Sequence, residues 1–179
     1  YEHDMDIDFY GRAQDDPFLP RLGVISGVEN LNMTRFDDHV WGTMGSNILL
    51  GGGGDDQIRG LGGDDIIRGG DGDDTLIGDR GNDLLDGGQG STEFVAGFGD
   101  DTLTGGDGAD AFVFYTGSHT GNDLITDYEE GVDRIEIYGD EAGAEIIYED
   151  WGVMVVIEGP EVFTMTIKDA WEIDLTFMG

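Results

Sequence analysis

The sequence predicts an all-β fold, a right-handed parallel β-roll (β-helix), and three observations support it. Residues 33–113 consist of nine consecutive nonapeptides that follow the pattern G-G-x-G-x-D-x-U-x, in which U is apolar, without an insertion or a deletion. The eighth position is apolar in every copy, and the fourth is glycine in every copy except at Phe36. Because the turn positions and the apolar positions share one period, a disordered glycine-rich linker is excluded.

Each nonapeptide divides into a turn and a short strand. Glycines at the first, second and fourth positions permit a tight six-residue turn. The remaining three residues, x-U-x, predict a strand whose central side chain points inward while its neighbours face solvent. Two nonapeptides make one coil of eighteen residues, so equivalent turns stack every second repeat. The predicted core column is Val40, Leu49, Ile58, Ile67, Leu76, Leu85, Phe94, Leu103 and Phe112.

The sixth position carries the candidate metal ligands. Sixth-position side chains of repeats n and n+2 face each other across the gap between coils. Two carboxylates and several turn carbonyls form an all-oxygen cage, which suits calcium better than magnesium or zinc. The sixth-position residues are Asp38, Asn47, Asp56, Asp65, Asp74, Asp83, Thr92, Asp101 and Asp110.

Segments on both sides of the repeats extend the pattern. Upstream, residues 25–31 lead into the first coil, and Glu29 lies nine residues before Asp38, at a sixth position. Downstream, residues 121–128 and 131–137 are similar to the D-x-I-x-D-F-x-x-G-x-D-x-I segment of the serralysin type. Together these features resemble the RTX calcium-binding β-roll of serralysin-type metalloproteases, alginate epimerase calcium modules, and RTX toxins, lipases and adhesins.

The resemblance implies a ligand set for each calcium ion. In that family an ion takes the sixth-position side chain and the second and fourth carbonyls of one repeat. It also takes the first and third carbonyls and the sixth-position side chain of the repeat eighteen residues on. The sixth-position pairs are then Asp38 with Asp56, Asp56 with Asp74, Asp74 with Thr92 and Thr92 with Asp110 on one side, and Glu29 with Asn47, Asn47 with Asp65, Asp65 with Asp83 and Asp83 with Asp101 on the other. Asp123 would close the last site against Asp101 or Asp110.

The implied turn ligands belong to the first four positions of the repeats. They are Gly51, Gly52, Gly53, Gly54, Gly60, Gly62, Gly63, Gly69, Gly70, Asp71, Gly72, Gly78, Arg80, Gly81, Gly97, Gly99, Gly105 and Asp107. We expect about six to eight bound ions. The sites that include Thr92 should be the weakest, because threonine supplies no charge and calcium affinity follows the number of charged ligands.

Composition restricts the partners and the compartment. Eight basic residues against forty acidic ones give a net charge of −32, which opposes binding to nucleic acid and to anionic membranes. The chain contains no cysteine, and its longest apolar run, Val153 to Ile157, is too short to span a bilayer. Tyr1 to Asp8 lacks the basic and apolar regions of a signal peptide. The resemblance instead implies export by a type I secretion system through a C-terminal signal, which residues 172–179 resemble, and a secreted, extracellular protein.

The flanks predict caps on a single domain. Residues 1–32 form the N-terminal cap and lead-in coil, 33–113 the roll, and 114–179 a C-terminal β cap that includes the possible secretion signal. Short strands are expected at 135–137, 146–148, 153–157 and 162–167. Antiparallel strands bearing Trp151, Phe163 and Trp171 would cover the last coil.

No catalytic residue is predicted, so the chain is not expected to be an enzyme. His3, His39 and His119 fit no zinc spacing. The serine and histidine of residues 117–121 are adjacent and make no triad. The predicted function is calcium-dependent folding, stability and secretion within a larger exported protein. A calcium-bridged polysaccharide-binding or adhesion module is the alternative, and an enzyme fragment with its own site is a third hypothesis.

Overall fold

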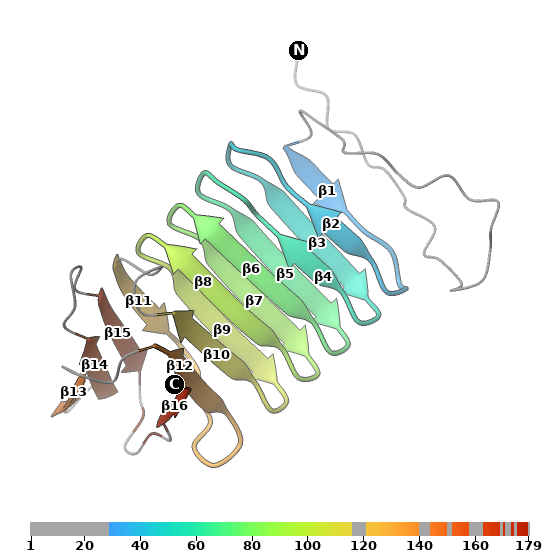
Figure 1. Ribbon diagram of the computed structural model, residues 1–179. Coiled ribbons are helices and arrows are strands. Elements are labelled where there is room, and N and C mark those ends of the chain that lie inside the picture. Colours follow the sequence, from blue (N-terminus) through green and yellow to red (C-terminus); the bar gives the residue numbers. More distant parts are fainter. Residues whose placement is uncertain are drawn as a thin grey trace.

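Two long β-sheets face each other along the repeat array (Figure 1). The computed structural model describes residues 29–115, 121–139, 144–149, 152–157, 163–168, 170, 173 and 175–178. Odd-numbered strands of the roll belong to a nine-stranded sheet and even-numbered ones to a seven-stranded sheet. The strands of the roll are β1 (Asn30–Asn32), β2 (His39–Trp41), β3 (Ile48–Gly53), β4 (Gln57–Arg59), β5 (Ile66–Asp71), β6 (Thr75–Arg80), β7 (Leu84–Gln89), β8 (Glu93–Phe98), β9 (Thr102–Asp107), β10 (Ala111–Tyr115), β11 (Gly121–Ile125) and β12 (Arg134–Tyr138).

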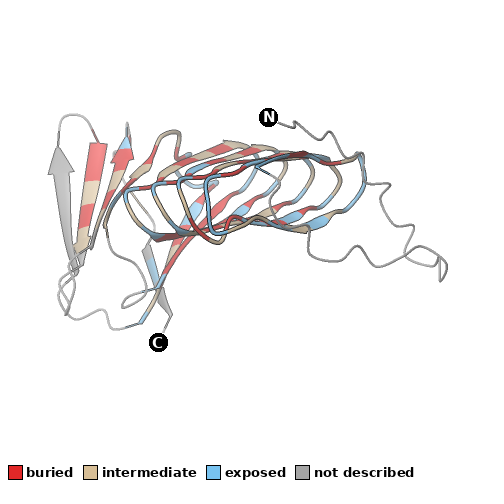
Figure 2. Cartoon of the chain, turned by 90° about the horizontal axis from the view of Figure 1, so that it is seen from above, coloured by how far each residue is buried: buried red, intermediate tan, exposed pale blue. Residues whose placement is uncertain are grey.

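The eighteen-residue coil sets the register, and the predicted fold class is confirmed. Leu49 pairs with Ile67 in the nine-stranded sheet, and Ile58 pairs with Leu76 in the other, all in parallel strands. The eighth-position side chains from Leu49 to Phe112 are at most 2% exposed, and they form the core strip between the two sheets that Figure 2 shows as buried. Phe94 and Phe112 stack with ring centroids 5.1 Å apart. One apolar residue per nonapeptide therefore builds a continuous core.

Most strands are longer than the three residues expected. From β5 to β9 each strand has six residues, which are the seventh to ninth positions of one repeat and the first three of the next. Gly52 pairs with Gly70 and Gly53 with Asp71, so the first half of each turn also takes part in strand pairing between coils. Identical turns stacked in register leave main-chain groups facing each other, and pairing satisfies them.

The C-terminal strands extend both sheets beyond the array. The strands are β13 (Ala144–Glu149), β14 (Gly152–Ile157), β15 (Phe163–Lys168) and β16 (Leu175–Met178). β15 pairs in parallel with β11, β14 and β13 follow it antiparallel, and β16 pairs in parallel with β12. Val153, Val155, Met165 and Ile167 are fully buried and join the core cluster.

Some of the expectations lie outside the described residues. These are the structure of residues 1–28, the segment 117–120 and the side chains of Trp151, Phe163 and Trp171. The three-part division of the chain therefore stays a prediction. Within the described ranges, no helix is long and apolar enough to cross a membrane.

Candidate metal centre

The sixth-position side chains form two rows, one along each turn edge of the roll. The turns before β2, β4, β6, β8 and β10 carry Asp38, Asp56, Asp74, Thr92 and Asp110, and the turns before β3, β5, β7 and β9 carry Asn47, Asp65, Asp83 and Asp101. All of them are buried except Asp38, which is half-buried. The alternating rows follow from the eighteen-residue coil, as the sequence predicted.

One carboxylate oxygen of each aspartate joins it to the preceding coil. The Asp56 N–H donates to Asp74 Oδ1 at 2.9 Å, and the Asp65 N–H donates to Asp83 Oδ1 at 2.8 Å. The same bond joins Asp38 to Asp56, Asn47 to Asp65, Asp83 to Asp101 and Thr92 to Asp110. It fixes the rotation of each carboxylate.

Among the residues that the structure describes, the second carboxylate oxygen of six sixth-position aspartates is buried and has no hydrogen-bond partner. This holds for Oδ2 of Asp56, Asp65, Asp74, Asp83, Asp101 and Asp110, and Thr92 Oγ1 is buried and unpartnered in the same way. Buried polar atoms are normally hydrogen-bonded, so a regular series of unsatisfied acceptors indicates a missing electropositive partner.

First-position glycines leave room for these oxygens. A Cβ on Gly69 would collide with Asp74 Oδ2 and would lie 2.7 Å from the Gly87 carbonyl oxygen of the next coil. The carboxylate oxygen of one repeat and the first-position carbonyl of the repeat eighteen residues on thus approach the same point. The second-position carbonyl of Gly52 likewise points at Gly70 in the next coil.

Burial makes the ionised form of these carboxylates unfavourable. Burial, more than the neighbouring carboxylates, raises the pKa of Asp56, Asp65 and Asp101 to about 7, although a main-chain N–H bond opposes it in each case. Burial also raises the pKa of Asp83 and Asp110 to about 6. A divalent cation between the coils would reverse this penalty by pairing with the negative charge. The donor set, carboxylate and carbonyl oxygen, fits calcium.

Main-chain carbonyls must supply much of any coordination shell. Within the described ranges no group of three or more histidine, cysteine, aspartate or glutamate side chains is placed to hold a metal ion. The third-position carbonyls also accept the N–H groups of the preceding coil, since Gly54 N–H donates to Asp71 O and Gly90 N–H to Asp107 O. The Arg80 guanidinium is cationic and has no acceptor atom, so only the Arg80 main chain could be a ligand, and the side chain lies over the Phe98 ring. His39 stacks edge-on against Trp41.

Each row ends on an aspartate beyond the repeats, and the sequence predicted only one of the two. Asp123 Oδ1 accepts the Asp101 N–H at 3.0 Å, which places it after Asp101 and not after Asp110. Asp133, which the sequence reading missed, accepts the Asp110 N–H at 2.9 Å. The signal was available, because residues 121–125 and 131–135 both repeat G-x-D-x-U. Longer spacings of 22 and 23 residues concealed them.

A second series of hydrogen bonds, between fifth-position residues of consecutive coils, was not predicted from the sequence. The Asp73 N–H donates to Asp55 Oδ1 at 2.9 Å, and the Asn82 N–H donates to Asp64 Oδ1 at 2.9 Å. These side chains reach toward the following coil, whereas the sixth-position side chains reach toward the preceding one. The fifth-position residues are solvent-exposed, so their role is to align the turns.

The comparison with protein-family models agrees with the repeat pattern. Residues 34–58, 41–76, 59–92 and 86–118 match the family model described as RTX calcium-binding nonapeptide repeat (4 copies). The solution structure of the AlgE6R3 subunit from the Azotobacter vinelandii mannuronan C5-epimerase is similar at 26% identity, covering 86% of this chain and 78% of that chain, with a TM-score of 0.26. The search of curated proteins gave no match.

Proposed function

Since residues 34–118 are RTX calcium-binding repeats and form a parallel β-roll, we propose that calcium binding drives the folding of this chain, as a module of a larger exported protein. The observation that carries the proposal is the series of buried carboxylate oxygens without partners. A fold that buries these charges is unfavourable without a cation and becomes favourable with one.

The ions would lie between consecutive coils in each row. An ion would be held by the unpartnered oxygen of one sixth-position residue, by turn carbonyls of both coils and by the sixth-position residue of the following coil. Seven unpartnered oxygens give seven such places, starting at Asp56, Asp65, Asp74, Asp83, Thr92, Asp101 and Asp110. A site held at a hundredfold above its dissociation constant contributes about 2.7 kcal/mol, so several sites together can decide whether the chain folds.

The proposed export rests on the resemblance to RTX proteins, and the charge and composition of the chain are compatible with it. A chain with a net charge of −32 and no cysteine can stay unfolded where calcium is scarce and fold where it is plentiful, without needing disulfides. A type I secretion system, which releases unfolded chains to the extracellular space, suits that behaviour. The role is then structural and not catalytic.

Circular dichroism tests the proposal directly. In EGTA the spectrum should be largely that of an unfolded chain, and millimolar calcium should produce a cooperative gain of β-structure. Magnesium should substitute poorly, because it demands six ligands in rigid octahedral geometry. A β-rich spectrum that persists in EGTA would contradict calcium-driven folding.

A pair of variants tests the ligand assignment. Asp65→Ala removes the acceptor of the Asn47 N–H and a buried oxygen without a partner, so it should raise the calcium midpoint of folding. Asp107→Ala is the matched control, because Asp107 is an exposed third-position residue whose main chain, not its side chain, bonds to Gly90. Equal midpoints for the two variants would show that the register of ligands is wrong.

The ninth-position column on the seven-stranded sheet does not favour polysaccharide binding. An outward column of the seven-stranded sheet reads Trp41, Arg59, Ile77 and Val95 along its paired strands. One aromatic and one arginine do not make the aromatic or basic stripe that a sugar polymer requires. The arginine is also paired with Asp79.

A further inference from the structure

The first coil differs from all later coils of the array at its second positions. Only the first two repeats carry threonine there, Thr34 and Thr43. The sixth-position residues of these repeats are Asp38 and Asn47, and neither has an oxygen among the buried unpartnered atoms. Hydrogen bonds from the two threonines to these sixth-position side chains connect the two observations.

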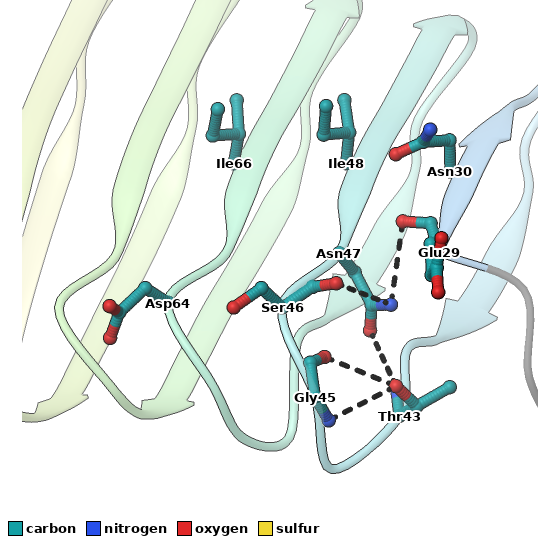
Figure 3. A pocket seen from close by; sticks show the side chains of 9 residues that line it. All are labelled: Glu29, Asn30, Thr43, Gly45, Ser46, Asn47, Ile48, Asp64 and Ile66. Atoms are coloured by element: carbon teal, nitrogen blue, oxygen red, sulfur yellow. Dashed lines mark hydrogen bonds between the residues drawn. The ribbon is translucent and has the colours of Figure 1, made fainter. Parts of the chain in front are cut away.

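Each threonine binds the sixth-position side chain of its own repeat. Asp38 Oδ2 accepts the Thr34 N–H at 2.9 Å and the Thr34 hydroxyl at 2.7 Å. Asn47 Oδ1 accepts the Thr43 N–H at 2.6 Å, and the Thr43 hydroxyl lies 3.2 Å from it. Figure 3 shows the second of these turns, with the Asn47 amide directed at Thr43 on one side and at Glu29 on the other. The oxygen that stays unpartnered in later coils is therefore satisfied by protein donors here.

Two more features make this coil unsuitable for a cation. The Asn47 Nδ2 group donates to the Glu29 carbonyl at 3.4 Å and to the Ser46 carbonyl at 3.3 Å, so an N–H donor faces the preceding coil where later aspartates present an acceptor oxygen, Oδ1. In the first repeat, the first position is Met33, which is buried and much larger than the glycine or alanine at the first position of every later repeat. A neutral amide supplies less charge to a calcium cage than a carboxylate, and a bulky first-position side chain occupies the space where later repeats hold the second carboxylate oxygen.

We propose that Thr34 and Thr43 take the place of calcium in the first coil, so that this coil closes without metal and the calcium rows begin at Asp56 and Asp65. The inference rests on the proposed function and narrows it. The pairs Asp38 with Asp56, Asn47 with Asp65 and Glu29 with Asn47 then hold no ion. Seven ions remain, one for each unpartnered oxygen.

Counting bound calcium tests the inference. Metal analysis of the full chain after equilibrium dialysis in calcium should give seven ions per wild-type chain. The double variant Thr43→Gly/Asn47→Asp restores the full repeat pattern in the second copy and should bind one more. Asn82→Asp is the matched control, because it adds the same charge at an exposed fifth position and should leave the count unchanged.

A second pair of variants separates a hydrogen-bonding role from a ligand role. Thr43→Val removes the hydroxyl and should raise the calcium midpoint of folding by less than twofold, with the ion count unchanged. Thr43→Ser keeps the hydroxyl and should stay close to wild type. If Thr43→Val loses one ion, the threonine is a calcium ligand and the inference is overturned, and this readout applies even if the double variant does not fold.

The remaining outcomes distinguish this inference from the proposed function. Anomalous scattering that places an ion beside Asp38 or Asn47, together with ions in the later coils, would overturn the inference alone. Absence of calcium binding anywhere in the chain would overturn the proposed function and the inference with it.

Discussion

Thr92→Asp should strengthen the roll in calcium and weaken it in chelator. Thr92 lies at a sixth position between Asp74 and Asp110, and it is 2% exposed. No carboxylate is available there for the Asp74 N–H, and Thr92 Oγ1 is unpartnered. Phe94 still fills the core two residues later, so the coil is intact where its ligand is missing.

The expected magnitude follows from the two gaps that this position faces. A carboxylate would contribute to the cage with Asp74 and to the cage with Asp110. If the carboxylate tightens each of these two cages a hundredfold, the pair adds about 5 kcal/mol to the free energy of unfolding at saturating calcium. For a chain of this size that corresponds to a rise in Tm of about 10 to 20 °C. Without calcium the sign reverses, because one more buried carboxylate must be ionised at neutral pH.

Thermal unfolding at saturating calcium, calcium titration and ion counting together decide the matter. Ser91→Asp is the control, since it adds the same charge at the neighbouring exposed position. The control should shift neither Tm nor the ion count. If wild type already holds tight ions on both sides of Thr92 and Thr92→Asp binds no better, carbonyls or water supply what is assigned to the carboxylate, and the ligand assignment for this row fails.

Three further predictions concern the pH dependence of the metal-free fold, the backbone conformation at Leu61 and the geometry of the calcium cages. Burial raises the pKa of Asp56 and Asp65 in the folded chain to about 7 from 3.8, so the metal-free fold loses stability as pH rises from about 4 to 7. Circular dichroism in EGTA should therefore show more β-structure at pH 4.5 than at pH 8. More β-structure at pH 8 would contradict this pH dependence. Leu61 has a φ of 78°, which is unfavourable for a residue with a side chain, so Leu61→Gly should stabilise the folded chain by about 1 kcal/mol. Denaturant unfolding curves recorded in calcium measure this change, and a loss of stability would show that the packing of the Leu61 side chain contributes more. Gly69→Ala would place a Cβ against Asp74 Oδ2 and should raise the calcium midpoint of folding, whereas Gly62→Ala, whose Cβ would lie 3.4 Å from the nearest atom, should leave the midpoint close to wild type; equal midpoints would refute the cage geometry.

The periodic pattern by itself determined the fold of the repeats and the identity of the core. An apolar residue every nine positions has one way to be buried continuously, which is a coil of two repeats, and Ile58, Ile67 and Leu76 lie where that requires. The same pattern predicted two rows of sixth-position side chains, because residues eighteen apart must stack. The family match supports calcium as the ion.

Only the tertiary structure decided which of those side chains lack partners and where the rows end. Asp123 and Asp133 take their places through chain paths of irregular length, and a spacing rule cannot follow an insertion. Thr34 and Thr43 are four residues before the side chains they bind, but a threonine hydroxyl can also face solvent, so composition does not reveal the bond. Stacked main chains also lengthened the strands into the turns, since pairing depends on the neighbouring coil and not on local propensity. The repeat pattern specifies the contacts that all copies share. The contacts at the ends of the array and at irregular copies depend on which atoms the folded chain brings together.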